Sequence, residues 1–226
     1  MLPRKLNFTG YLFIGEKAPE FTGQSTEGMI HFPDDYFGHW KILFSHPADF
    51  TPVCSTEILE LAEIQDDFDK LDTKLVVMST DGLNSHIEWV RSLQGIKLYD
   101  RETVTIAFPL VSDPNLEISK KYGMIHPSYS TTRDVRGVFI IDPEDKNCAT
   151  FFYPSTTGRN MEEVKRVLIA LQRSARSNVL TPANWEPGDD VLIPSPESVE
   201  EAQKLTAKEN PDLYSLEWYL WFKKSK

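Results

Sequence analysis

The chain has 226 residues, of which 40% are hydrophobic, 26% charged and 12% aromatic. This composition is typical of a globular protein, and the length is sufficient for one or two domains. The net charge of −10 and the lack of a Lys/Arg block exclude nucleic acid as a main partner. No apolar stretch approaches the roughly 18 residues that span a bilayer, so we expect no membrane partner.

The cysteine and histidine content limits the chemistry further. The chain contains only Cys54 and Cys148, with no CxxC motif, and five scattered histidines. A disulfide framework is therefore not expected, and a reducing, cytoplasmic compartment is indicated. The spacing offers no set of metal ligands, so we expect neither a metal nor another cofactor.

From about residue 40, short apolar runs alternate with helical patterns. Residues 55–71, for example, place Ile58, Leu61 and Ile64 on one stripe, which predicts a helix. Strands are predicted at 41–45, 74–79, 108–111, 137–141 and 149–153, and helices at 55–71, 84–93, 115–122 and 160–176. Strand–helix alternation followed by a hairpin and a helix predicts an α/β fold, with a mixed sheet flanked by helices.

The composition changes after residue 177, where four prolines fall within fifteen residues. We therefore predict a main domain over 1–177 and a C-terminal arm over 178–226. The arm should hold a polar helix at 197–209 and an aromatic tail that includes Trp218, Tyr219 and Trp221. Such a tail is too apolar for water, so it packs either on its own domain or across a dimer, and we favour the dimer.

The segment over 44–57 lies between a buried strand and an amphipathic helix, which puts Cys54 in the first turn of that helix. Free backbone N–H groups and the positive end of the helix dipole favour a thiolate there. Thr51 can aim a hydroxyl at the same sulfur, while Pro47 and Pro52 stiffen the loop. A lone cysteine is often an inert buried side chain, but these neighbours favour a reactive thiol.

Several motifs resemble one family. Pro47-x-x-x-Thr51-x-x-Cys54 resembles the active-site signature of the peroxiredoxins, and the string over 45–54 resembles the 1-Cys, peroxiredoxin 6-like subfamily of the AhpC/TSA peroxiredoxins. Residues 136–142, 153–160 and 181–185 resemble, in turn, the strand of the family's active-site arginine, the segment that supplies a second arginine, and the start of its C-terminal arm. The resemblance implies a thioredoxin-like fold with an extended arm.

The resemblance also implies an activity. Cys54 would attack hydrogen peroxide or an organic hydroperoxide and become a sulfenic acid, in antioxidant defence. Arg136 would stabilise the thiolate and bind peroxide, and Thr51 would donate to or orient the substrate oxygens. Arg159 would add positive charge and hold Arg136, while Glu57, one turn beyond the cysteine, would orient an arginine.

His46 stays open between two roles. The subfamily places a histidine at this position beside the sulfur, which suggests a role in the active site. The alternative is a histidine that bonds the loop backbone and holds the Pro47 turn.

Nothing after Cys148 is a cysteine, so no resolving residue is expected in the C-terminal region. Cys54 should then work alone and be reduced by an external thiol or by a thioredoxin or glutathione system. Cys148 is predicted to be a half-buried strand residue, although an intermolecular disulfide stays open. The family implies a homodimer, or a decameric ring of dimers.

Two other functions compete with the peroxidase. A peroxide sensor or holdase would use the same oxidation of Cys54 without turnover. A Cys–His hydrolase would pair Cys54 with His46 as its base, but it leaves the two arginines without a role, because acyl transfer needs an oxyanion hole.

Overall fold

The computed structural model describes residues 11–201 and 210–225. They belong to two compact units, which divide between Met161 and Glu162. The sequence predicted a boundary after residue 177, but the last long helix, α5 (Met161–Ser177), belongs with the second unit.

The first unit contains a mixed seven-stranded sheet in the order β2-β1-β5-β4-β3-β6-β7. Strand β3, inside the sheet, pairs in parallel with β4 and antiparallel with β6. The strands are β1 (Phe21–Ser25), β2 (Gly28–Phe32), β3 (Trp40–Ser45), β4 (Thr73–Ser79), β5 (Leu110–Ser112), β6 (Arg136–Ile141) and β7 (Asn147–Tyr153). The predicted hairpin is confirmed, because β6 and β7 pair antiparallel with Arg136 opposite Tyr153.

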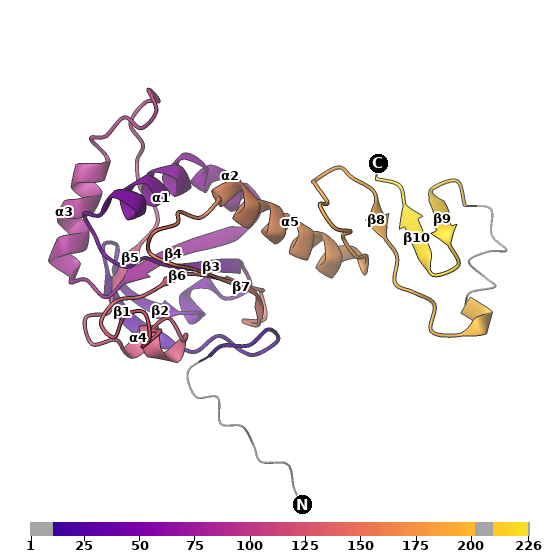
Figure 1. The fold of residues 1–226 in the computed structure, drawn as a ribbon, viewed down its shortest axis with the longest axis horizontal. Coiled ribbons are helices and arrows are strands. Elements are labelled where there is room, and N and C mark those ends of the chain that lie inside the picture. Colours follow the sequence, from indigo (N-terminus) through magenta and orange to yellow (C-terminus); the bar gives the residue numbers. More distant parts are fainter. Residues whose placement is uncertain (1–10, 202–209, 226) are drawn as a thin grey trace, which may run out of the picture. The chain divides into compact units, whose positions relative to one another are not determined.

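Helices cover both faces of this sheet. They are α1 (Pro52–Glu63), α2 (Gln65–Lys70), α3 (Leu83–Leu93) and α4 (Glu117–Lys121), with a short 3-10 turn, η1 (Asp34–Tyr36). Figure 1 shows α1 and α2 on one side of the sheet and α4 on the other. All six residues of β3 and all six of β6 are buried, as expected for strands that are covered on both faces.

One core cluster shows how the sheet alternates. Leu43, Val76 and Phe139 lie on one face and pack with Ile118 and Tyr122 from the α4 region. Their chain neighbours in the strands point to the opposite face, because successive strand side chains alternate. The predicted α/β class and covered mixed sheet are confirmed.

One local prediction needs correction, and one hairpin was not predicted. The helix expected over 55–71 begins three residues earlier, at Pro52, and is interrupted at Ile64, which has φ −108° and ψ 10°. The apolar spacing continues across this break, so the pattern alone did not reveal it. The hairpin β1–β2 was not predicted, although Phe21 and Phe32 are buried in it and stack with ring centroids 5.1 Å apart.

The second unit contains α5 and a three-stranded sheet in the order β8-β10-β9. Its strands are β8 (Val191–Leu192), β9 (Leu213–Glu217) and β10 (Leu220–Lys223). A small core joins Ala170 of α5 to Val179, Trp185 and Val191. The aromatic tail forms the β9–β10 hairpin, whereas most of the helix predicted at 197–209 lies outside the described residues.

Within the ranges that the structure describes, no helix combines the length and the hydrophobicity that crossing a membrane requires.

Candidate active site

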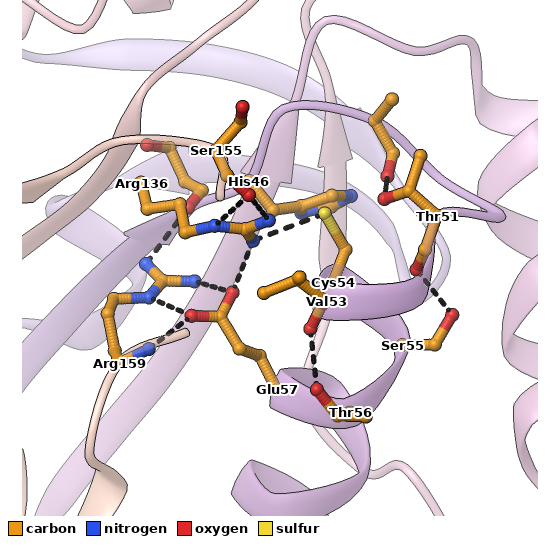
Figure 2. Close-up of polar contacts among 12 residues, drawn as sticks. His46, Thr51, Val53, Cys54, Ser55, Thr56, Glu57, Arg136, Ser155 and Arg159 are labelled. Carbon is orange, nitrogen blue, oxygen red and sulfur yellow. Dashed lines mark hydrogen bonds and ion pairs between the residues drawn. The ribbon is translucent and has the colours of Figure 1, made fainter. Parts of the chain in front are cut away.

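Cys54 is the third residue of α1 and is fully buried. Thr51 is the N-cap, with extended backbone angles, and Pro52 occupies the first turn, where its missing N–H costs nothing. The preceding loop leaves β3 after Ser45 and passes through Pro47, which is also buried. The expected position of the sulfur in the first turn of a helix is thus confirmed (Figure 2).

Arg136 is the side chain that reaches the sulfur. Its Nη1 lies 3.3 Å from Cys54 Sγ and 2.6 Å from Glu57 Oε2, and Nε and Nη2 donate to the Ser155 carbonyl at 3.2 and 2.6 Å. As the first residue of β6, Arg136 is delivered to the end of β3 by the antiparallel pairing of the two strands. A guanidinium has five N–H donors. The four contacts above use four of them, which leaves one N–H of Nη2 outside these contacts.

Glu57 holds the two arginines together. It lies one turn after Cys54 on α1 and also accepts hydrogen bonds from Arg159, from N at 2.7 Å, Nε at 2.9 Å and Nη2 at 2.8 Å. Burial alone would raise the pKa of Glu57, but Arg159 and then Arg136 outweigh it and lower that pKa. Figure 2 shows the carboxylate between the two guanidinium groups. Glu57 is therefore an anion that orients both cations.

The hydrogen bonds of the Arg159 side chain go to Glu57 and to backbone carbonyls, and not to the sulfur of Cys54. Its Nη1 donates to the carbonyls of Ser45 and Gly137 at 2.9 and 2.8 Å, and its guanidinium carbon lies 5.2 Å from the centre of the Phe44 ring. Most of its donors therefore bind the protein, and its contribution to the site is positive charge and the position of Glu57.

Thr51 is oriented differently from the expectation. Its Oγ1 donates to the Ala48 carbonyl at 2.8 Å, so the hydroxyl proton is directed to the loop backbone instead of to Cys54. The lone pairs of this oxygen can still accept a hydrogen bond. Thr51 is half-buried, beside a cysteine that is fully buried.

His46 follows β3 directly and is fully buried. Its Nε2 lies 2.9 Å from Asp49 Oδ1, and the other carboxylate oxygen of Asp49 lies 2.8 Å from His86 Nδ1. Burial lowers the pKa of His46. Sequence reasoning missed Asp49 and its contact with His86, because 37 positions separate the two partners.

A second pair that sequence reasoning missed stands behind Arg136. The Tyr129 hydroxyl accepts a hydrogen bond from the Ser155 N–H at 2.8 Å and lies 2.5 Å from Ser155 Oγ. The carbonyl of the same Ser155 receives two N–H groups of Arg136. Tyr129 therefore fixes the backbone that aims the guanidinium.

Cys148 lies on β7 and is half-buried, as predicted. Burial, and then the nearby Asp142 charge, raise the pKa of its thiol to about 11. Cys148 is therefore a poor source of thiolate at neutral pH. Both cysteines are free thiols in this structure.

Comparison with known families supports a peroxidase assignment of this geometry. Residues 14–146 match the model of the AhpC/TSA family, and residues 170–208 match the C-terminal domain of 1-Cys peroxiredoxin. The chain is similar to a peroxiredoxin of Methanosarcina mazei, with 48% identity over 212 residues that cover 93% of this chain and 97% of the relative. A peroxiredoxin of Aquifex aeolicus is 42% identical over 221 residues, covering 93% of this chain and 96% of that protein.

Solved structures agree with the sequence matches. The peroxiredoxin 6 of Arenicola marina superposes with a TM-score of 0.82 at 34% identity, covering 95% of this chain and 99% of the other. A yeast mitochondrial 1-Cys peroxiredoxin, described as resolved through glutathione and thioredoxin systems, also has a TM-score of 0.82, at 38% identity over 95% of this chain and 100% of the other. With more than half of its residues matched by the family model and a buried Cys54 beside an arginine, this chain belongs to the AhpC/TSA family of peroxiredoxins, in its 1-Cys group, and is a thiol peroxidase.

Proposed function

We propose that Cys54, Arg136 and Thr51 carry the peroxide step. The observation that carries this assignment is the 3.3 Å contact between Arg136 Nη1 and Cys54 Sγ, made by a guanidinium that Glu57 and Ser155 hold in place. A cation fixed beside the sulfur stabilises the thiolate and then the charge that moves to the peroxide oxygens.

In the reaction, the Cys54 thiolate attacks the terminal oxygen of the hydroperoxide. A sulfur–oxygen bond forms, the oxygen–oxygen bond breaks, and the departing alkoxide or hydroxide takes a proton and leaves as alcohol or water. Sulfur is oxidised to the sulfenic acid and the peroxide is reduced. The uncommitted N–H of Arg136 donates to the leaving oxygen, and the Thr51 lone pairs accept a hydrogen bond from the O–H group of the hydroperoxide during binding.

The other predicted residues act through these three. Glu57 and Arg159 position Arg136, because Glu57 accepts hydrogen bonds from both guanidinium groups. Pro47 shapes the buried loop between β3 and α1. His46 lies at the start of the same loop and contributes a neutral imidazole to the site.

The sulfenic acid is reduced by a thiol from another molecule. The first external thiol forms a mixed disulfide with Cys54 and releases water, and a second thiol restores Cys54 and leaves as a disulfide. Glutathione or thioredoxin systems fit this role by chemistry, since the yeast relative is resolved through them. Cys148 is a weak candidate for this role, because burial and the Asp142 charge raise the pKa of its thiol.

The test is intact mass and peptide mapping of reduced protein after one equivalent of peroxide. We expect one added oxygen on Cys54, or two after further oxidation. A disulfide between Cys54 and Cys148 would refute the single-cysteine assignment. Repeated turnover with a thiol reductant distinguishes the enzyme from a sensor, which would stop after one oxidation.

We further propose that the chain forms a homodimer, with a decameric ring as the higher assembly to look for, and that it works in the cytoplasm. The β9–β10 turn supports an interface, because Trp218 and Tyr219 are 72% and 51% exposed and such side chains are costly to leave in water. Sedimentation of the wild-type chain and of Trp218→Gln tests this proposal. A wild-type chain that sediments as a monomer at all concentrations would refute it.

A further inference from the structure

Three buried titratable groups form a chain at the loop that leads from β3 into α1 and so to Cys54. His46 and Asp49 belong to that loop, and His86 lies on α3. The exposed fractions of the two histidines are 0% and that of Asp49 is 7%. Asp49 bridges the rings, with Oδ1 at 2.9 Å from His46 Nε2 and Oδ2 at 2.8 Å from His86 Nδ1. Of these three groups, only His46 is assigned to the proposed peroxidase site.

The partners of His86 determine how many protons it carries. Its Nδ1 faces the Asp49 carboxylate, and its Nε2 lies 3.2 Å from the Val111 carbonyl oxygen. A carbonyl can only accept, and so can an ionised carboxylate. Both ring nitrogens of His86 must then donate, which makes the ring a cation unless Asp49 carries the proton.

The two ring nitrogens in contact with the Asp49 carboxylate favour its ionised form. Burial would raise the pKa of Asp49, but the hydrogen bonds from His46 and His86 outweigh burial and hold that pKa well below its usual range. Its backbone N–H also donates to Asp81 Oδ2 at 2.6 Å. This bond fixes the loop and does not change the number of protons on the Asp49 carboxylate or on the two rings. The buried carboxylate is an anion, and an anion at this depth needs a paired cation.

His46 is the opposite case. Its Nε2 proton is used on Asp49, and its Nδ1 is buried without a hydrogen-bond partner. A second proton on Nδ1 would add a buried charge with no acceptor. Burial lowers the pKa of His46, Asp49 opposes this, and the positive charges of His86 and Arg159 reinforce it. His46 is therefore neutral, with its lone pair on Nδ1.

We propose that His86 is a buried imidazolium that neutralises Asp49 and thereby holds His46 in the neutral form with Nδ1 unprotonated. His86 is then a positioning residue, since it acts on the site only through Asp49 and His46. The functional half of this inference rests on the proposed peroxide step, whereas the charge assignment does not.

A packed route connects this chain to the reacting sulfur. The His46 ring lies 4.9 Å from the Trp89 ring, centroid to centroid, and Trp89 Nε1 donates to Ser55 Oγ at 3.4 Å. Ser55 follows Cys54 in α1, and its hydroxyl donates to the Thr51 carbonyl at 2.8 Å. A change in the charge of His46 would therefore act on side chains that pack around the first turn of α1.

The same trio has the spacing of a metal site, with its three ligand atoms within 4.8 Å of one another. A divalent ion would have to replace the protons that His46 and His86 donate to Asp49. The hydrogen bonds from the two rings already satisfy the Asp49 carboxylate, so we place protons, and no metal ion, between the rings and the carboxylate. A bound metal would contradict this assignment.

The charge assignment is tested by ¹⁵N NMR of the imidazole groups in the full-length, reduced protein at neutral pH, before and after treatment with a chelator. We expect two protonated nitrogens for His86, and one protonated and one bare nitrogen for His46. A bare nitrogen on His86, two protons on His46, or signals that change when a metal is removed would each overturn the proposal.

The positioning role is tested with His86→Leu and His86→Asn by the pH profile of kcat/KM for peroxide. Both variants remove the cation, so His46 should take the second proton beside Asp49. The amide of His86→Asn can still donate to Asp49 and protects folding. We expect kcat/KM to fall about tenfold near neutral pH, the loss typical of removing the partner behind a functional imidazole, and to recover as pH rises and His46 loses that proton.

The matched control is His39→Leu, which removes a histidine from an exposed pair with Asp72 and should change neither kcat/KM nor the profile. A wild-type profile in both His86 variants would overturn the positioning role. If the wild-type chain did not reduce peroxide, the proposed function would be refuted, while the charge assignment from NMR would stand.

Discussion

Glu57→Gln should be the most destabilising single change in the active site that keeps side-chain volume. Four hydrogen bonds join Glu57 to Arg136 and Arg159, and the substitution removes the negative charge that accepts all four. The side chains of these three residues are only 2–3% exposed. Removing one partner of a buried ion pair costs about 3–5 kcal/mol, because the remaining charge stays buried without compensation.

The same carboxylate gives the effect a pH dependence. The folded-state pKa of Glu57 is lowered from its ordinary value of 4.5. A lowered folded pKa contributes stability that is fully present above the ordinary value and is lost as pH falls through the lower, folded value. The difference in unfolding free energy between wild type and Glu57→Gln should therefore be constant from neutral pH to about pH 5 and shrink in stronger acid.

The assay is urea unfolding of the reduced proteins followed by circular dichroism at several pH values. Glu60→Gln is the matched control, since Glu60 lies one turn further along α1 and pairs with Arg101 at the partly exposed surface. Screening by water makes such a pair contribute little. If Glu57→Gln were no less stable than this control, the buried-anion account of the site would be refuted.

Four further substitutions test individual side chains. Cys54→Ser should abolish peroxide turnover while Cys148→Ser retains it, and retained turnover in the first variant would overturn the site assignment. Arg136→Lys keeps the charge but loses the planar fork that binds Sγ, Glu57 and Ser155 together, so kcat/KM should fall by roughly 10²–10³. Tyr129→Phe removes the acceptor of the Ser155 N–H, so kcat/KM should fall roughly tenfold with little change in unfolding midpoint; an unchanged kcat/KM would remove Tyr129 from the support of Arg136.

Much of the catalytic centre could be predicted from short-range sequence. The apolar run before residue 46 and the helical spacing after it place Cys54 in a first turn, as the structure confirms. Motif resemblance located Arg136, and antiparallel pairing with β3 explains why a residue 82 positions away reaches the sulfur. These features are local patterns or belong to the family signature.

What sequence reasoning missed depends on contacts between distant segments. Asp49 meets His86 across 37 positions, and Tyr129 meets Ser155 across 26. No periodicity records such pairs, because each partner is an ordinary polar residue in its own segment. The break at Ile64 was missed for a related reason, since the apolar stripe continues through it while the backbone angles change.

Charge balance connects these separate contacts into one site. Arg136 and Arg159 share a single carboxylate, Glu57, so the cluster keeps one net positive charge, and the guanidinium nearest the sulfur belongs to it. That charge matches one thiolate. Oxidation of Cys54 to a neutral sulfenic acid removes the matching anion, so the cluster then favours an incoming thiolate reductant over a neutral thiol. The histidine chain adds no further net charge, because the buried carboxylate of Asp49 is balanced beside it. The arrangement therefore provides one cation beyond those that the buried carboxylates balance, placed at the sulfur, in a region where a second one would be costly.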